Sequence, residues 1–232
     1  MTVIGIDRSK ETLKEEIIAV AGVEPRKIRN IYIFGSRVYG LHTVNSDYDA
    51  IVTATSMYVN HEIFEGDYNI HITTPDSFED KLRQHDVHCL ECIFAPDEAR
   101  VHITTNYRDA FRLNKMKLKK MLLTQSAAAW AKNRRRIEQG NIMGGAKSIF
   151  HSLRILKFGV QILEHGRIID FEAANKLWYK IEGFDEFEWI EYKEQFNQIR
   201  TQYMKEFKKF DQVLSNVSVI GEALETAIQI GE

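Results

Sequence analysis

The chain has 232 residues, 44% of them hydrophobic and 28% charged, which is typical of a globular protein with one large or two modest cores. Its formal net charge is −2, so overall charge alone gives no sign of a nucleic-acid partner. No apolar run approaches the roughly 20 residues of a membrane-spanning helix, so no membrane partner is expected.

The first half of the chain shows short hydrophobic patterns in the order helix, strand, strand, strand, helix. Helical spacing occurs at 11–21, strand patterns occur at 31–34, 48–52 and 68–73, and a further helix begins near Pro75. Gly22 and Pro25 end the first helix, and Ser77 is the expected N-cap of the second.

The second half changes to long helical periods. Candidate helices cover 112–138, 144–165, 171–182 and 187–214. We therefore predict an α+β protein with a small α/β domain at 1–110 and a helical domain at 111–232.

A glycine-containing turn follows the first predicted strand. Gly35 permits a tight turn and close approach to a ligand, Ser36 supplies a hydroxyl, and Arg37 offers a bidentate phosphate contact. A helix beginning there would add free N–H groups that favour an anion. The turn is therefore predicted to bind nucleotide phosphates.

Two carboxylates, Asp47 and Asp49, lie at the start of the next predicted strand. Because side chains alternate along a strand, both point to one face, about 7 Å apart. Such a pair suits Mg²⁺ or Mn²⁺, which prefer carboxylate and phosphate oxygens, and metal ions at such a site stabilise phosphoryl transfer. We expect both residues to be catalytic metal ligands.

Gly35-Ser36 followed by Asp47-Tyr48-Asp49 resembles the signature of the DNA polymerase beta-like nucleotidyltransferase superfamily. The resemblance implies a mixed sheet with flanking helices, a nucleoside triphosphate donor such as ATP, Mg²⁺, and nucleotidyl transfer to an acceptor. The segments 88–94 and 147–154 are similar to a branch of uncharacterised bacterial and phage nucleotidyltransferases. The acceptor is not implied.

The superfamily usually has a third carboxylate on a neighbouring strand, and the resemblance puts Asn69 at that position. An asparagine cannot act as a base. Asp67 replaces it if the strand is shifted by two residues, and His71 is an alternative proton acceptor. A third alternative is that no residue replaces it. Asp67 is the catalytic residue we expect.

Three further residues of this half have apolar surroundings in the sequence. Glu91 lies in an apolar run, where a charge is costly unless paired, so we expect it to hold Arg37 or another basic residue. Cys89 and Cys92 lack zinc-site spacing and are expected in the core. With only these two cysteines and no signal-peptide pattern, the chain is expected to be cytoplasmic.

Lys147, His151 and Arg154 lie at positions i, i+4 and i+7 of a predicted helix, so they form one stripe. Three potentially cationic side chains on an otherwise apolar helix suit a cleft that holds phosphates. We expect the stripe to bind the donor's phosphates and to face Asp47 and Asp49.

The segment 112–136 contains nine Lys and Arg residues and no Asp or Glu. Such a patch is typical of nucleic-acid contact and equally of a solvated helix face. Three functions therefore compete: an active nucleotidyltransferase, a nucleotide- or nucleic-acid-binding module that has lost catalysis, and a helical interaction protein. The asparagine at position 69 favours the second.

Overall fold

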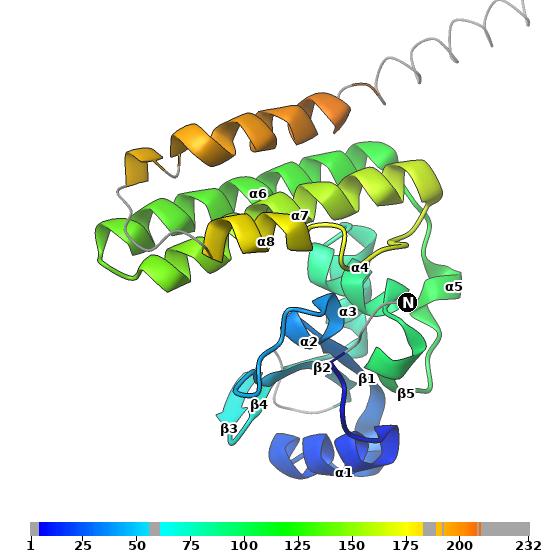
Figure 1. The fold of residues 1–232 in the computed structure, drawn as a ribbon. Helices are drawn as coiled ribbons and strands as arrows, with labels where there is room; N and C mark the ends of the chain where they lie inside the picture. Colours follow the sequence, from blue (N-terminus) through cyan, green and yellow to red (C-terminus); the bar gives the residue numbers. More distant parts are fainter. Residues whose placement is uncertain (1–4, 56–60, 183–188, 192, 208, 210–232) are drawn as a thin grey trace, which may run out of the picture.

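The computed structural model describes residues 5–55, 61–182, 189–191, 193–207 and 209. Its centre is a five-stranded mixed sheet in the order β3-β4-β2-β1-β5 (Figure 1). The strands are β1 (Ile28–Phe34), β2 (Tyr48–Ala54), β3 (His61–Glu65), β4 (Tyr68–Thr73) and β5 (Arg100–Ile103). Strand β2 pairs with β4 in parallel, and all other neighbours are antiparallel. The mixed sheet confirms the expected fold class.

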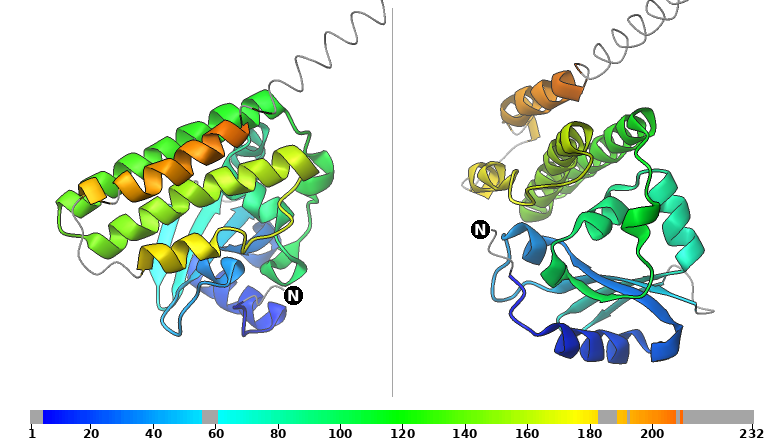
Figure 2. Two further views of the ribbon diagram at one scale, coloured as in Figure 1. Left: turned by 45° about the horizontal axis from the view of Figure 1, so that its top comes forward. Right: turned by 90° about the vertical axis from the view of Figure 1, so that its right-hand side faces the viewer.

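Helix α1 (Lys10–Ala21) covers one face of the sheet (Figure 2). The Ser9 side chain accepts a hydrogen bond from the Thr12 amide at 3.1 Å and so caps the helix at its start. Leu13 and Ile17 are fully buried, which is the face that the helical spacing predicted. Gly22 ends the helix in the left-handed conformation, with φ of 60°.

Short helices lie on the opposite face. They are α2 (Ser36–Tyr39), α3 (Pro75–Arg83), α4 (Val87–Phe94) and α5 (Tyr107–Ala110), with 3-10 turns at Pro25–Lys27 and Asp97–Ala99. The predicted N-cap Ser77 is wrong. Thr74 caps α3, because its hydroxyl accepts from the Ser77 amide at 3.1 Å and Pro75 occupies the first helical position.

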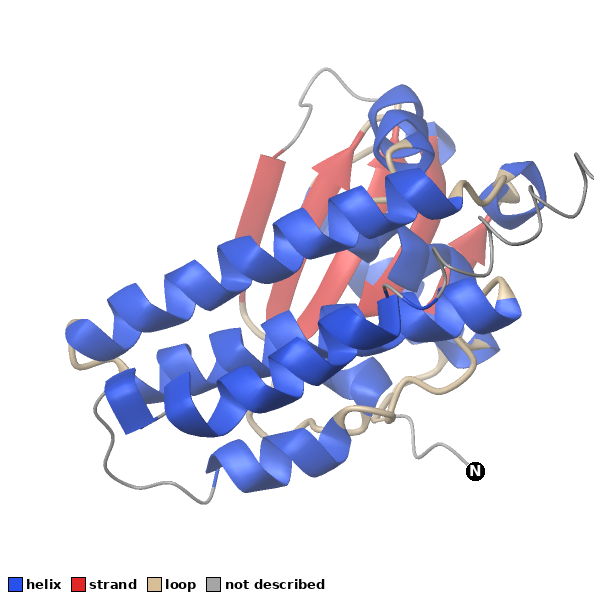
Figure 3. Ribbon diagram, turned by 90° about the horizontal axis from the view of Figure 1, so that it is seen from above, coloured by secondary structure: helices blue, strands red, loops and turns tan. Residues whose placement is uncertain are grey.

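The C-terminal half is helical, as predicted. Helices α6 (Lys115–Glu138) and α7 (Ile142–His165) pack side by side and cross above the strands (Figure 3). Helix α8 (Asn175–Glu182) follows, and residues 189–191, 193–207 and 209 are also helical. The rest of the predicted helix 187–214 lies outside the described residues.

The change from sheet to long helices falls between β5 and α6, near the predicted seam. One buried cluster nevertheless runs from strand residues such as Ile31 and Ile70 to Leu118, Leu122 and Leu156 in the long helices. The division into domains at 1–110 and 111–232 therefore stays a prediction. None of the helices in the described ranges has the length and apolar character of a membrane span.

Candidate active site

A cavity of about 830 Å³ lies between helix α2 with the loop that follows it, the start of β2, and helices α7 and α8. Six residues that the sequence singled out line it: Ser36, Asp47, Asp49, Lys147, His151 and Arg154. The structure therefore brings the acidic strand start and the α7 stripe to one space, although they are a hundred residues apart in the chain.

Gly35 lies against Asp49 at the base of this space. Its φ of 79° and ψ of −156° define a conformation that essentially only glycine adopts. A Cβ atom at Gly35 would lie 2.3 Å from the Asp49 Oδ2 atom. Glycine is therefore required here both by the turn and by the room that the carboxylate occupies.

Replacing Gly35 by Ala is expected to lower the free energy of unfolding by more than the roughly 1–3 kcal/mol of backbone strain, because Asp49 must also move. The matched control is Gly66→Ala, since Gly66 also has a positive φ, of 58°, but no atom lies within 4 Å of its Cβ position. Chemical denaturation of both variants measures the difference. Equal losses would show that the contact with Asp49 is unimportant.

The two carboxylates differ in environment. Asp47 is exposed and Asp49 is half-buried at the start of β2. Burial raises the pKa of the Asp49 carboxyl, the Asn69 amide works against this, and the charge of Asp47 raises the pKa further. A divalent cation between the two carboxylates would relieve that repulsion.

The oxygen atoms around Asp49 fit a hard cation. The Asn69 Nδ2 atom donates to Asp49 Oδ1 at 2.9 Å, which leaves the amide oxygen as an acceptor. That oxygen is buried and has no hydrogen-bond partner among the described residues. Among the described residues, no cluster of three or more His, Cys, Asp or Glu side chains could hold a metal ion by itself. A cation at Asp47 and Asp49 would therefore need further ligands. Such a site suits Mg²⁺, which commonly completes its shell with substrate phosphates and water.

Arg154 is fixed at the cavity wall by buried partners. Its Nη2 atom lies 3.1 Å from Glu91 Oε1, and its guanidinium lies 3.7 Å from the centroid of the Tyr39 ring. The Tyr39 hydroxyl donates to the other Glu91 oxygen, and the Asn175 amide donates to the Tyr39 carbonyl at 2.7 Å. The expectation that Glu91 holds a basic residue is confirmed, and that residue is Arg154 rather than Arg37.

His151 is not a third cation of the α7 stripe. Burial, and then the charge of Arg154, lowers its pKa well below the usual value, so the imidazole is neutral at pH 7. The Nδ1 atom lies 2.8 Å from Arg154 Nη2, which can only donate. His151 Nε2 therefore carries the proton and is a hydrogen-bond donor.

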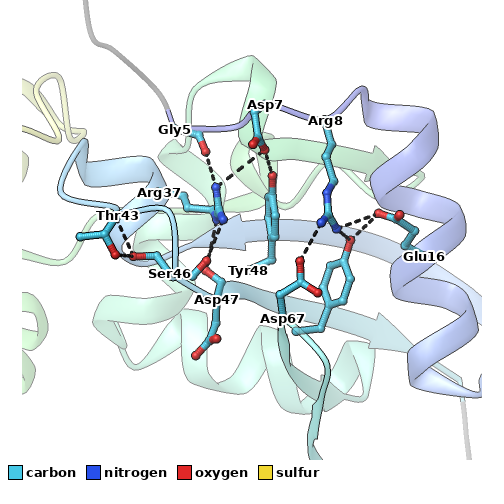
Figure 4. A network of polar contacts seen from close by, with 11 residues as sticks. Gly5, Asp7, Arg8, Glu16, Arg37, Thr43, Ser46, Asp47, Tyr48 and Asp67 are labelled. Atoms are coloured by element: carbon cyan, nitrogen blue, oxygen red, sulfur yellow. Dashed lines mark hydrogen bonds and ion pairs between the residues drawn. The ribbon is translucent and has the colours of Figure 1, made fainter.

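Arg37 does not line the cavity, so the structure does not support its predicted phosphate contact. Its guanidinium donates to the Gly5 carbonyl at 2.8 Å and to the Ser46 carbonyl at 2.7 Å, and it lies 3.8 Å from the Tyr48 ring centroid. Figure 4 shows the Asp47 carboxylate directed away from these contacts. Arg37 is buried and holds the loop that carries Asp47.

The third predicted catalytic residue, Asp67, is also outside the cavity. It is exposed, and its Oδ2 atom pairs with Arg8 at 2.6 Å, which lowers its pKa (Figure 4). His71 lies in β4, four residues after Asp67, and it lines a separate pocket, where Glu62 of β3 is 3.2 Å from its Nε2 atom. The strand register puts Asn69 directly beside Asp49.

An aromatic wall was missed by the sequence analysis. Phe150, Trp178 and Tyr179 line the cavity, with the Phe150 and Trp178 rings 5.5 Å apart. The helical pattern at 171–182 was visible, but nothing in it indicated that α8 would lie beside the cavity. Cys89 and Cys92, by contrast, are buried free thiols, as expected.

Residues 18–111 match the family model described as a nucleotidyltransferase domain. No curated protein matches the chain. Two solved structures show weak overall likeness. A nucleotidyltransferase-like protein from Exiguobacterium sibiricum has 12% identity over 96% of this chain and 80% of its own, with a TM-score of 0.32. An aminoglycoside 6-adenyltransferase from Bacillus subtilis has 10% identity over 90% of this chain and 92% of its own, with a TM-score of 0.33.

The family match is confined to the first half of the chain. That match begins within α1 and ends just after α5, and it includes the whole sheet together with Gly35, Asp47 and Asp49. The match therefore covers about two fifths of the chain, and residues 18–111 are similar to a nucleotidyltransferase domain.

Proposed function

We propose that the protein is a metal-dependent nucleotidyltransferase that moves a nucleoside monophosphate from a nucleoside triphosphate, with ATP as the first donor to test, to an acceptor. The observation that supports this proposal is the cavity itself. The acidic pair Asp47 and Asp49 and the basic pair Lys147 and Arg154 line the same space. That arrangement suits a polyanionic donor bound with a cation.

In this proposal, Asp47 and Asp49 hold the metal, with the free amide oxygen of Asn69 beside them. When bound, Mg²⁺ or Mn²⁺ offsets phosphate charge and stabilises the attacking and leaving oxygens. The room beside Asp49 is kept open by Gly35. Other side chains that line the cavity position the donor.

Lys147 and Arg154 oppose the negative charge of the triphosphate, and Ser36 and the His151 Nε2–H donate hydrogen bonds to its oxygens. In the transfer, an acceptor oxygen bonds to the α-phosphorus, the bond from that phosphorus to its bridging oxygen breaks, and pyrophosphate leaves. Arg154 is already fixed by Glu91 and Tyr39. It therefore needs little reorganisation as charge develops, which is how such sites stabilise transition states.

The aromatic wall is suited to the base of the donor. Trp178 and Tyr179 offer ring faces on which any base can stack, and such stacking is tolerant of base identity. Base preference is therefore not expected from these residues alone, and the test must compare all four triphosphates.

The test uses α-labelled and γ-labelled nucleoside triphosphates with Mg²⁺ or Mn²⁺ and a mixed pool of RNA, protein and metabolites. Nucleotidyl transfer is expected to move the α-label, but not the γ-label, onto one acceptor class and to release pyrophosphate. Absence of α-label from every class would contradict the proposal.

A second candidate function is a nucleotide-binding module without catalysis. It is favoured by one observation, the Asn69 side chain at the position beside Asp49 where a carboxylate is expected. Metal-dependent triphosphate binding without release of pyrophosphate in the presence of acceptors would support it.

A further inference from the structure

A second pocket adjoins the cavity that Asp47 and Asp49 line, which we call the donor cavity. It has a volume of about 420 Å³ and lies between the start of α4 and helices α6 and α7. Lys147 and His151 line both spaces, so the two are neighbours with a shared wall. We call this second space the α6–α7 pocket.

The α6–α7 pocket is basic. Lys132, Arg136 and Lys147 line it, and no Asp or Glu is among its lining residues. Arg136 Nη1 donates to the Gly144 carbonyl at 2.9 Å and to the Ser148 hydroxyl at 3.0 Å, both of which are uncharged. None of the three basic residues forms an ion pair with another residue in the described part of the chain. Their charges are therefore available to an anion.

Asp86 directly precedes the lining residue Val87, and both of its oxygens accept hydrogen bonds. Asp86 caps α4 by accepting from the His88 amide at 3.0 Å, and its other oxygen accepts from Gln125 Nε2 at 2.8 Å. Asp86 belongs to the lining of a different pocket, near β4. Its oxygens accept from uncharged donors, and Asp86 forms no ion pair with Lys132 or Lys147 in the part of the chain that the structure describes.

Two histidine rings form the side of the pocket nearest the donor cavity. The rings of His88 and His151 are stacked, with centroids 5.6 Å apart and planes within 12°. The His88 Nδ1 atom is buried and has no hydrogen-bond partner among the residues that the structure describes. A ligand that supplies hydrogen-bonding oxygens would satisfy this unpaired nitrogen.

We propose that the α6–α7 pocket binds a phosphate group of the acceptor. The proposal rests on the proposed nucleotidyl transfer and names the class of acceptor: a molecule with its own phosphate, anchored beside Lys132 and Arg136. Because Lys147 and His151 form the shared wall, an anchored acceptor extends its nucleophile past them toward the donor. A polycationic acceptor would be repelled by the same charges.

The test is a titration of the metal-free 232-residue chain with inorganic phosphate, in which binding is monitored through the NMR signals of the His88 imidazole. His88 lines the α6–α7 pocket and the pocket near β4 but not the donor cavity, and Lys132 lines only the first, so the His88 signal and the Lys132 variant together identify the site. Saturable shifts are expected. Lys132→Glu is expected to weaken binding at least about tenfold, since it replaces a charged contact by repulsion.

The matched control is Arg135→Glu, the same charge change on an exposed α6 residue that does not line the pocket. It is expected to bind phosphate within about twofold of the parent, because Arg135, unlike Lys132, is not a lining residue of the pocket and water screens its charge from the bound anion. Equal affinity in Lys132→Glu and the parent, or a His88 signal that phosphate does not move, would overturn the proposal.

Competition then identifies the source of the phosphate. A 5′-phosphorylated oligonucleotide and a sugar phosphate are each added to the phosphate-bound protein. Displacement by the first assigns a polynucleotide end, and displacement by the second assigns a small phosphorylated metabolite. Displacement by neither would overturn the acceptor assignment. Because phosphate binding needs no turnover, a failure of this proposal is separable from a failure of nucleotidyl transfer.

Discussion

Asp49→Asn is expected to lower the rate of nucleotidyl transfer at least about 10³-fold, because a lost metal ligand removes several kcal/mol of transition-state stabilisation. The substitution keeps the shape of the side chain and its hydrogen bond with Asn69. Release of pyrophosphate in the presence of the labelled acceptor measures the rate. The matched control is Asp67→Asn, which removes an exposed carboxylate outside the cavity and is expected to retain the parental rate.

The same variant is expected to gain stability in the absence of metal. Burial and Asp47 raise the pKa of the folded Asp49 carboxyl above its unfolded value. The stabilising contribution of the protonated group is therefore complete below the usual aspartate pKa and is lost as the pH rises through the raised pKa. At pH 7, metal-free Asp49→Asn should melt no lower than the parent. A lower melting temperature of Asp49→Asn would show that the substitution destabilises the fold, so that its lost activity would not report on the metal site.

Glu91→Ala is expected to lower the free energy of unfolding by about 3–5 kcal/mol, because it leaves the Arg154 charge buried without its partner. Chemical denaturation measures the loss. The control is Glu138→Ala, which breaks an exposed ion pair with Arg134 in α6 and should cost no more than about 0.5 kcal/mol.

The double variant Glu91→Leu/Arg154→Met separates stability from function. Replacing both charges by apolar side chains should restore most of the stability lost in Glu91→Ala. Transfer should stay impaired, because the cavity then lacks the fixed cation of Arg154. Full activity in the stable double variant would show that Arg154 is scaffold only.

The local chemistry of the site could be predicted from sequence, because it depends on short-range geometry. Strand alternation put Asp47 and Asp49 on one face, and helical spacing put Lys147 and Arg154 on another. The structure places all four around one cavity. Gly35 was predicted for its turn, although the close approach to Asp49 depends on the pairing of β1 with β2.

The errors concern long-range contacts. Arg37 follows the predicted phosphate turn, but its direction is set by the Gly5 carbonyl and the Tyr48 ring, which only the folded chain brings near. The choice of Asp67 required β4 to pair with β2 two residues out of the observed register. A register cannot be read from one strand alone, because every two-residue shift keeps the same face pattern.

The most direct test of the account is the binding of a non-hydrolysable nucleoside triphosphate by calorimetry, which needs no knowledge of the acceptor. We predict that Mg²⁺ strengthens binding to the parent protein at least about tenfold over EDTA, since the cation links the carboxylates to the phosphates. In Asp47→Asn/Asp49→Asn this Mg²⁺ effect should disappear, with the fold intact by circular dichroism. If the double variant binds the Mg²⁺-triphosphate as tightly as the parent, the nucleotide site is not at Asp47 and Asp49.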